Sequence, residues 1–159
     1  MFNVKLAKAT AQQQQLPPEF RPDEGKKSYG NCYAYALILL TLDWTEMLTL
    51  PGFMSDSVDF ESDDYWNDIT SKNIISYVKR DVEMLGWNFT EDSFNNNIEK
   101  GMYRIAIYTN NKGFHFMRQN KDGSWSEKWG PSGEIIRVTR EFLSGYMLLG
   151  VYRIFKKTE

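Results

Sequence analysis

Apolar positions follow two different periods along the chain. Between Ser71 and Gly86 they recur every three to four residues, which predicts a helix with one apolar face. From residue 102 onwards, apolar and polar residues alternate in short runs separated by turn sequences, which predicts strands. The expected strands cover residues 102–109, 114–119, 124–129, 134–138 and 146–155, with a short helix over 139–145. Helices followed by an antiparallel sheet are typical of an α+β domain.

A longer helix is expected nearer the amino terminus, after the segment SYGNC. Asn31 is a favourable N-cap residue, so this helix should begin at Asn31 or Cys32. It should run to about Leu48, because the helix-breaking sequence LPG follows. Its apolar residues nearly surround it, which predicts a central helix that is buried on most sides.

The first 28 residues differ from the rest of the chain. Residues 1 to about 10 suggest a short strand or arm, and residues 11–28 are polar, contain proline and are poor in core residues. Such a segment is typical of a linker or of a chain draped over a surface. We therefore expect an amino-terminal arm and linker over residues 1–28 and a single domain over residues 29–159.

The overall composition fits one soluble domain and excludes several classes of partner. The chain has 159 residues, of which 42% are hydrophobic and 15% aromatic, so it can form a core without metals or disulfides. Its net charge of -2 argues against a general nucleic-acid binder, which needs a basic surface. No apolar run approaches the length of a membrane span, and no secretory signal is evident. We expect a cytoplasmic protein that binds neither nucleic acid nor membrane, although export by a signal-less route would leave no trace in the sequence.

The residues that could carry chemistry are few. Cys32 is the only cysteine and His115 the only histidine, so the chain cannot supply the usual ligands of a zinc site. A calcium loop, a Walker motif and a dinucleotide glycine motif are absent, and no G-x-S-x-G elbow accompanies the histidine. We therefore expect no metal and no cofactor, and a cysteine–histidine pair remains as the available catalytic chemistry.

Cys32 stands at the expected start of a helix, which is where this chemistry needs a thiol. The positive end of the helix dipole lowers the pKa of a thiol and favours the thiolate. A neighbouring imidazole completes the ion pair and passes the proton to a leaving group. Backbone N–H groups of the first helical turn, including that of Cys32, point to where an oxyanion forms. The alternative is a small buried cysteine with a packing role, since free cysteine is among the most buried residue types.

His115 lies in the expected strand GFHFMRQ. Alternation puts Phe114 and Phe116 on one face of this strand and His115 on the other, together with Met117 and Gln119. The imidazole is the candidate general base. The alternative is an exposed or hydrogen-bonded strand histidine without a catalytic role.

A third residue should orient the imidazole, and the hairpin turn decides which one it is. If NKDG forms a three-residue loop closed by Asn120 and Ser124, Glu127 shares the face of His115. A two-residue loop would turn Ser126 to that face and point Glu127 away. Glu127 is the favoured orienting residue, with Ser126, Asn120 and a more distant residue as alternatives.

The segment GNCYAYA resembles the nucleophile segment of papain-like cysteine peptidases, in which Gly-Ser-Cys-Trp-Ala-Phe opens the central helix. Asn31, Tyr33 and Tyr35 stand here in place of the Ser, Trp and Phe. The hairpin HFMRQNKDGSWSEKWG resembles that of small bacterial and phage members of the clan. The resemblance implies a papain-like fold, with a central helix packed on a carboxy-terminal antiparallel sheet, and a nucleophile, base and third residue at Cys32, His115 and Glu127.

The resemblance also has departures. Papain-like enzymes place an oxyanion-hole glutamine six residues before the cysteine, and that position here is Lys26. Tyr29 and Asn31 are therefore the candidate oxyanion residues, with a packing role as the alternative for Tyr29. In bacterial proteins with a similar hairpin, the residue matching Glu127 is a histidine.

Three functions are consistent with these residues. The first is a cysteine peptidase or amidase that transfers an acyl group from an amide to Cys32, with a host protein, an isopeptide or a cell-wall peptide as substrate. The second is an acyltransferase that uses the same pair and an amine acceptor. The third is a non-catalytic binding or inhibitor protein on a degenerate papain-like scaffold. The segment 50–100 would form a wall of the cleft. Its acidic and aromatic residues would select a cationic or sugar-bearing substrate, or would belong to a solvated loop; they are Asp56, Asp59, Asp63, Asp64, Tyr65 and Trp66.

Overall fold

The computed structural model describes residues 4–23, 30–40, 50–55, 59, 61–131, 133–139 and 142–157. Within these ranges four helices precede the sheet, and their bounds are α1 (Val4–Gln13), α2 (Cys32–Ala36), α3 (Asp63–Asp68) and α4 (Ile74–Met84). The strands are β1 (Trp87–Asp92), β2 (Met102–Asn110), β3 (Gly113–Gln119), β4 (Trp125–Lys128), β5 (Ile135–Val138) and β6 (Met147–Lys156). The predicted α+β class is confirmed.

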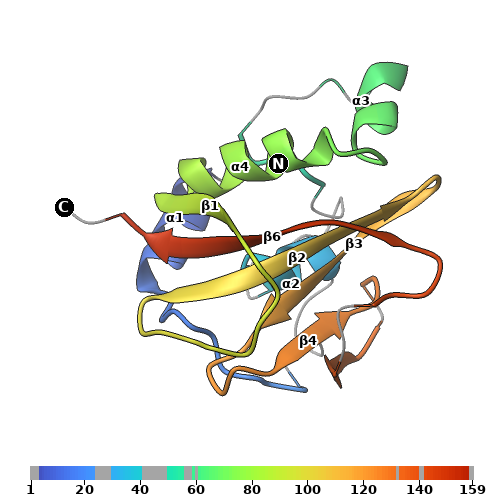
Figure 1. Cartoon of the computed structure of the whole chain (residues 1–159). Coiled ribbons are helices and arrows are strands. Elements are labelled where there is room, and N and C mark those ends of the chain that lie inside the picture. Colours follow the sequence, from blue (N-terminus) through green and yellow to red (C-terminus); the bar gives the residue numbers. More distant parts are fainter. Residues whose placement is uncertain are drawn as a thin grey trace.

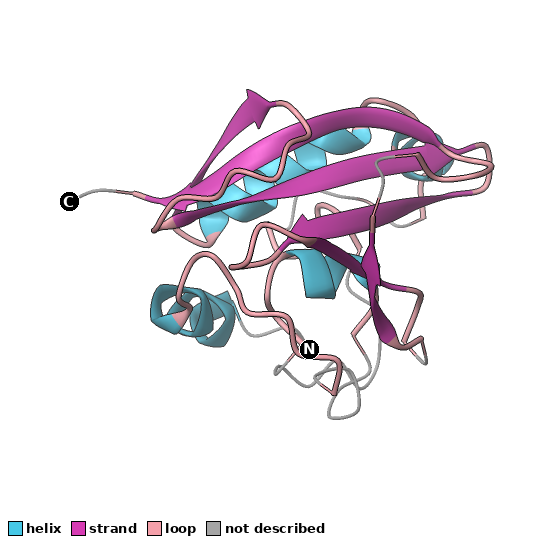
Figure 2. Ribbon diagram, turned by 60° about the horizontal axis from the view of Figure 1, so that its bottom comes forward, coloured by secondary structure: helices cyan, strands magenta, loops and turns pink. Residues whose placement is uncertain are grey.

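The six strands form one antiparallel sheet in the order β1-β6-β2-β3-β4-β5, and the views in Figures 1 and 2 show them side by side. Strand β6 lies between β1 and β2, so the carboxy-terminal strand joins β1 to the rest of the sheet. The strands expected from alternation are confirmed as β2 to β6. Strand β1 was not among them. None of the described helices is long and apolar enough to cross a membrane.

The main core lies on one face of the sheet, where residues of all four helices meet it. Figure 1 shows α2 beside β2 and β3 and α4 running near β1, and side chains of both helices belong to the main core. Tyr103 and Ile105 of β2 point into this core, as does Phe116 of β3. The predicted helix between Ser71 and Gly86 is confirmed as α4, whose apolar face packs here.

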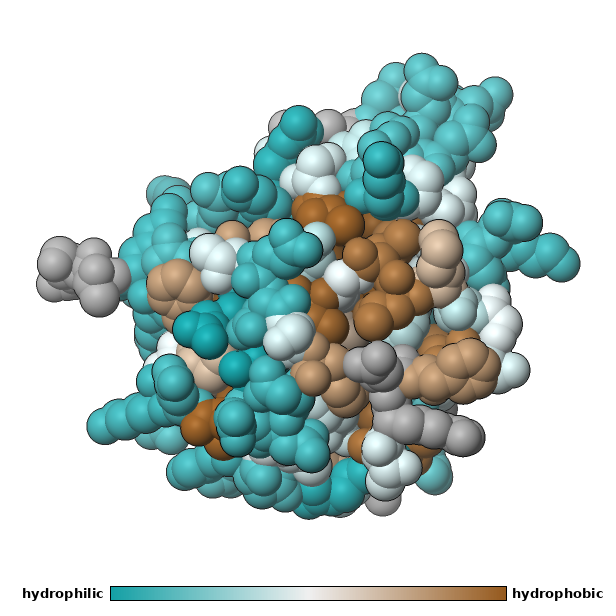
Figure 3. All heavy atoms as spheres, viewed as in Figure 1, coloured by the Kyte–Doolittle hydropathy of each residue, from teal (hydrophilic) through white to brown (hydrophobic). Residues whose placement is uncertain are grey.

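The opposite face carries a smaller apolar cluster, composed of Ala106, Tyr108, Met117, Trp125 and Val151. No described helix contributes to this cluster. Phe94, from the segment after β1, stacks on Trp125 with ring centroids 4.3 Å apart. Viewed as in Figure 1, the molecule shows apolar residues gathered near its middle with hydrophilic residues around them (Figure 3).

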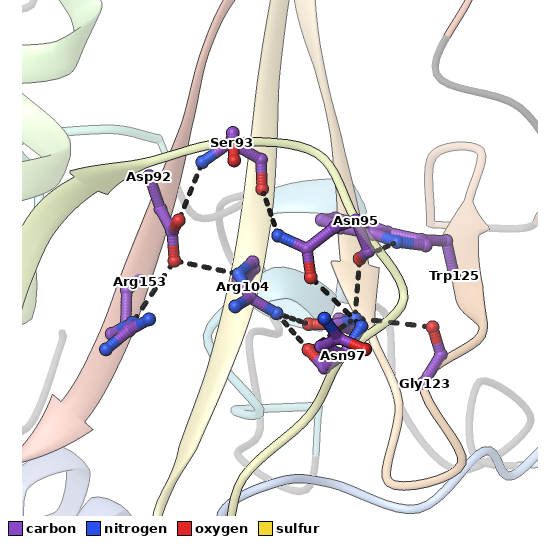
Figure 4. Close-up of polar contacts among 9 residues, drawn as sticks. Asp92, Ser93, Asn95, Asn97, Arg104, Gly123, Trp125 and Arg153 are labelled. Atoms are coloured by element: carbon purple, nitrogen blue, oxygen red, sulfur yellow. Dashed lines mark hydrogen bonds and ion pairs between the residues drawn. The ribbon is translucent and has the colours of Figure 1, made fainter.

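A polar network ties the segment after β1 to the sheet (Figure 4). Asp92 accepts hydrogen bonds from the Nε atoms of Arg104 at 2.8 Å and Arg153 at 3.1 Å. Arg104 also donates to Gln119 at 3.0 Å, and the Gln119 amide donates to the carbonyl of Asn95 at 2.9 Å. Partial burial works to raise the pKa of Asp92, but the hydrogen bonds from Arg104 and its neighbours outweigh it and lower the pKa.

Helix α2 is much shorter than predicted, because the chain leaves the helix at Leu37. The N–H of Leu39 donates to the carbonyl of Ala34 at 2.9 Å, and the N–H of Ile38 donates to that of Tyr35 at 3.1 Å. This pair of bonds is a Schellman turn, and it places Ile38 in the left-handed region at φ 59°. The predicted helix to Leu48 is therefore wrong over residues 37–40, while residues 41–49 lie outside the described part.

The amino-terminal segment is not a strand or a surface arm in the described residues. Val4–Gln13 forms helix α1, and its Ala7 and Ala11 are fully buried in the main core. Beyond the helix, the carbonyl of Leu16 accepts a hydrogen bond from the N–H of Gly101 at 2.7 Å. Small residues four apart let this helix approach the core closely, so α1 packs against the main core.

Two further predictions concern loops. The segment 51–68 contains helix α3, which Ser62 caps by accepting a hydrogen bond from the N–H of Asp64 at 3.2 Å. The predicted helix over residues 139–145 is not formed at Phe142–Gly145, which makes a turn before β6. Residues 140 and 141 lie outside the described part.

Candidate functional site

The hairpin between β3 and β4 has the three-residue loop that favours Glu127. The N–H of Asn120 donates to the carbonyl of Ser124 at 2.7 Å, and Gly123 takes the left-handed conformation at φ 84°. Met117 therefore pairs with Glu127 across the two strands. The predicted register is confirmed, and Glu127 lies on the same face of the sheet as His115.

His115 and Glu127 form a close buried pair. Nε2 of His115 lies 2.6 Å from Oε2 of Glu127, and the two side chains are 1% and 6% exposed. Trp129 donates its Nε1–H to the other carboxylate oxygen at 3.0 Å and stacks on the imidazole with ring centroids 3.7 Å apart. Each oxygen of Glu127 thus accepts one hydrogen bond, and the imidazole ring is held between its carboxylate partner and an indole.

The alternative orienting residues lie on the other face of the sheet. Ser126 shares a short hydrogen bond with the hydroxyl of Tyr35 in α2, and donates to Oδ1 of Asn120 at 3.0 Å. Arg118 stacks its guanidinium 3.8 Å from the centre of the Tyr35 ring and donates to the Tyr35 carbonyl at 2.9 Å. Ser126 and Asn120 therefore hold α2 on the sheet and do not contact His115.

Cys32 is the first residue of α2, as predicted, but its thiol is buried. Burial raises the pKa of the thiol from 9.0 to about 12, while backbone hydrogen bonds from Phe116, Tyr33 and Cys32 and the charge of Lys128 work in the opposite direction. The helix has five residues, so few aligned peptide dipoles stabilise a thiolate at its start. The effect of burial on the pKa exceeds that of the backbone hydrogen bonds and of Lys128, so the thiol is neutral at physiological pH.

Cys32 and His115 belong to opposite faces of the sheet. The Phe116 ring packs against Tyr33 of α2 at a centroid distance of 5.0 Å, and the Phe116 backbone reaches the thiol. Successive residues of a strand point to opposite faces, so His115 points away from α2. It joins Trp129 and Tyr146 instead, at centroid distances of 3.7 and 6.2 Å.

The two candidate oxyanion residues have different outcomes. Asn31 is the N-cap of α2, and its Oδ1 accepts a hydrogen bond from the N–H of Ala34 at 3.0 Å. The predicted N-cap is confirmed, and this oxygen serves the helix end. Tyr29 and the Lys26 position lie outside the described residues.

Sequence reasoning missed two residues of these surroundings, Lys128 and Trp129. Lys128 is buried on the thiol side of the sheet, where Nζ donates to the carbonyls of Gly130 at 2.5 Å and Pro131 at 3.0 Å. Burial lowers the pKa of Lys128, and the neighbouring Cys32 works to raise it. Alternation in WSEKWG could have shown that Lys128 and Glu127 face opposite ways, but the stacking of Trp129 on His115 has no sequence signal.

A surface pocket of about 340 Å³ opens over Glu127. Its lining residues are Met117, Glu127, Arg137, Val138, Thr139, Phe142, Leu143 and Ser144. Apolar side chains dominate the walls, and Glu127 contributes a carboxylate that is only 6% exposed. No group of three or more Cys, His, Asp or Glu residues that could hold a metal ion occurs within the described ranges.

Comparison with known proteins gives a family and no described activity. The profile of a family described as a domain of unknown function, DUF7689, matches residues 23–153. This span includes Cys32, all of β1 to β5 and most of β6. No curated protein and no solved structure shows significant similarity to the chain. The chain belongs to the DUF7689 family.

Proposed function

We propose that the chain is a non-catalytic binding protein whose ligand occupies the pocket over Glu127. The observation that carries the proposal is the position of Cys32 and His115 on opposite faces of the sheet. A thiol enzyme needs its base within hydrogen-bond reach of the nucleophile, directly or through one water. The imidazole is turned away from α2, so among the described residues Cys32 and His115 do not form that arrangement.

The state of both groups also favours binding over catalysis. The thiol has a pKa of about 12, because burial disfavours the thiolate, which is the nucleophilic form. The imidazole is 1% exposed beneath Trp129, so a substrate has little access to it. A catalytic pair needs an ionisable nucleophile and an accessible base, and these two residues instead complete the packing of each face.

The pocket has the composition of a small-ligand site. Such sites combine apolar walls with a few fixed polar groups that orient the ligand. Here Met117, Val138 and Leu143 supply apolar wall, and Glu127 supplies a carboxylate held by His115 and Trp129. A carboxylate fixed by two donors is pre-organised, so a ligand does not have to order it on binding.

A titration with 1-butanol tests this proposal. Methyl-labelled protein should show saturable NMR shifts at Met117, Val138 and Leu143, because this alcohol fits the apolar walls. The Cys32→Ala variant should give the same shifts. The Ser144→Trp variant places a large side chain at the rim and should lose them. Shifts confined to residues around α2, or no saturable shift in the wild type, would overturn the proposal.

A cysteine hydrolase on a papain-like scaffold is the second candidate, and one observation favours it. The thiol receives backbone hydrogen bonds from Phe116, the chain neighbour of His115, and from the first turn of α2. Such donors stabilise a thiolate or an oxyanion. The site would then have Cys32 as nucleophile, His115 as base and Glu127 as orienting residue, with a peptide or amide as substrate.

An activated ester distinguishes the two candidates. A p-nitrophenyl ester of an N-acylated amino acid should give a burst of p-nitrophenolate and an acyl adduct on Cys32 if the chain is a thiol enzyme. Transfer of that acyl group to an added amine, rather than to water, would indicate the acyltransferase variant of the same chemistry. We expect neither a burst nor an adduct in the native protein, and an adduct that forms rapidly would favour the second candidate.

A further inference from the structure

Taking the pocket over Glu127 as the binding site proposed above, we propose that its ligand carries an alkylammonium group. The ammonium hydrogen-bonds the carboxylate of Glu127, and the alkyl part packs against Met117, Val138 and Leu143. The inference deepens the proposed function by naming the charge and shape of the ligand. It rests on the charge of the lining, the free acceptor capacity of Glu127 and the size of the pocket.

Glu127 is the one carboxylate among the described residues that line the pocket. It accepts one hydrogen bond at each oxygen, from His115 at 2.6 Å and from Trp129 at 3.0 Å. A carboxylate has about four acceptor positions, so capacity for a further donor remains. A neutral imidazole carries one N–H, so the hydrogen bond from His115 does not require a second proton on the ring.

The positive charge in the lining is directed elsewhere. Arg137 donates from the same nitrogen to Asp122 at 2.9 Å and to Ser124 at 2.5 Å, in the β3–β4 turn. Its guanidinium also lies 4.1 Å from the centre of the Phe20 ring. Hydrogen bonds from Ser124, together with Arg137, lower the pKa of Asp122 to about 2, so this carboxylate stays ionised beside the guanidinium. Arg137 is thereby committed to the turn, and an anionic ligand would meet Glu127 without a compensating cation.

The rest of the lining fits a short aliphatic chain. Phe142 and Leu143 add apolar surface, and Thr139 and Ser144 add hydroxyl groups that can accept from an ammonium. A volume of about 340 Å³ is at the small end of ligand sites and suits a chain of a few carbons. Two sources share this chemistry, a free alkylamine and the side chain of a lysine in a peptide.

Three probes of nearly equal shape test the charge preference: n-butylammonium, 1-butanol and butanoate. NMR titration of the methyl-labelled chain gives a dissociation constant for each one. We expect n-butylammonium to bind about tenfold more tightly than 1-butanol, as a charge-assisted hydrogen bond implies, and butanoate to bind most weakly. Nα-acetyl-lysine methylamide then separates the sources, because tighter binding than n-butylammonium indicates a peptide lysine and equal or weaker binding indicates a free amine.

A matched pair of variants tests whether the charge of Glu127 causes the preference for n-butylammonium. Glu127→Gln keeps the shape and an acceptor but removes the charge, so it should abolish the preference for n-butylammonium over 1-butanol. Glu134→Gln removes an equal charge from an exposed residue outside the lining and should leave the preference unchanged. The probe series in the wild type does not depend on the folding of either variant.

The outcomes separate this inference from the function on which it rests. Equal binding of 1-butanol and n-butylammonium, or preferred binding of butanoate, would overturn the alkylammonium assignment and leave the pocket as a binding site. A preference that survives in Glu127→Gln would also overturn it. The absence of a saturable shift with all three probes would overturn the inference and the proposed function together.

Discussion

Nε2 of His115 lies 2.6 Å from Oε2 of Glu127, on the face of the sheet turned away from Cys32. The register of the β3–β4 hairpin brings His115 and Glu127 to the same face of the sheet. The alternation of side chains along β3 turns this face away from the thiol of Cys32. The residues that suggested a catalytic triad therefore divide into a polar pair beside a surface pocket and a thiol within the main core.

Removing the carboxylate of Glu127 should destabilise the protein. Glu127→Ala leaves Nε2 of the buried His115 and Nε1 of the partly exposed Trp129 without their acceptor. Loss of such a charged acceptor costs about 2–4 kcal/mol in the free energy of unfolding, as measured by urea denaturation. Glu127→Gln should cost less, because the amide oxygen still accepts. An effect of Glu127→Ala no larger than that of the exposed control Glu134→Ala would contradict the buried pairing.

Asp81 should be a second point of high sensitivity, because it joins α4 to α2 and to the segment after residue 50. The carboxylate is fully buried and accepts from the Tyr33 hydroxyl at 2.5 Å, the Gly52 N–H at 2.8 Å and the Ser55 N–H at 3.0 Å. Asp81→Ala leaves these donors unsatisfied and should lower the free energy of unfolding by about 3 kcal/mol. The control is Glu83→Ala, at an exposed position of the same helix. Equal unfolding curves for the two variants would refute this role.

Gly123 should be intolerant of a side chain, because it sets the register of Glu127. A Cβ there would lie 2.3 Å from the carbonyl oxygen of Asn96, in a residue with φ 84°. Gly101→Ala, at φ 85° but with open space around it, measures the backbone strain alone, about 1 kcal/mol. Gly123→Ala should cost clearly more than Gly101→Ala by thermal unfolding, and similar costs would mean that the contact with Asn96 is unimportant.

The buried thiol should make stability depend on alkaline pH. The native pKa of Cys32, about 12, exceeds its ordinary value of 9.0, so the unfolded chain releases this proton first as pH rises. The stability that the protonated thiol gives to the folded state is complete below pH 9.0 and is lost as the pH rises towards about 12. Over this range the free energy of unfolding falls by about 1.4 kcal/mol per pH unit. Cys32→Ala should therefore lose less stability than the wild type between about pH 9.5 and 10.5 in urea denaturation. Parallel pH dependence of the two proteins would contradict the raised pKa.

The local features of the site follow from the sequence. The turn residues of NKDG determine the hairpin register, and Asn31 caps the helix that begins at Cys32. Alternation correctly separates Phe116 from His115. Alternation cannot show which face α2 covers, because the two faces offer comparable apolar surface. One face has Phe114 and Phe116, and the other has Met117 and Trp125.

The missed features depend on tertiary packing. Helix α2 ends in a Schellman turn whose left-handed position is Ile38, where glycine would have given a signal and a β-branched residue gives none. Ala7 and Ala11 are the only buried residues of helix α1. Two small apolar residues form too weak a pattern for the sequence to distinguish a packed helix from a polar arm. Both segments are fixed by the core they contact rather than by their own propensities.

The rate at which iodoacetamide alkylates Cys32 tests most directly whether the thiol is a packing residue or a nucleophile. Because the chain has a single cysteine, mass spectrometry reads one adduct. At about pH 8 the native protein should react about a thousandfold more slowly than the chain unfolded in urea, since three pKa units separate the two thiols and burial limits access. Native alkylation as fast as that of the unfolded chain, or faster, would contradict the assignment of function to the pocket rather than to the thiol.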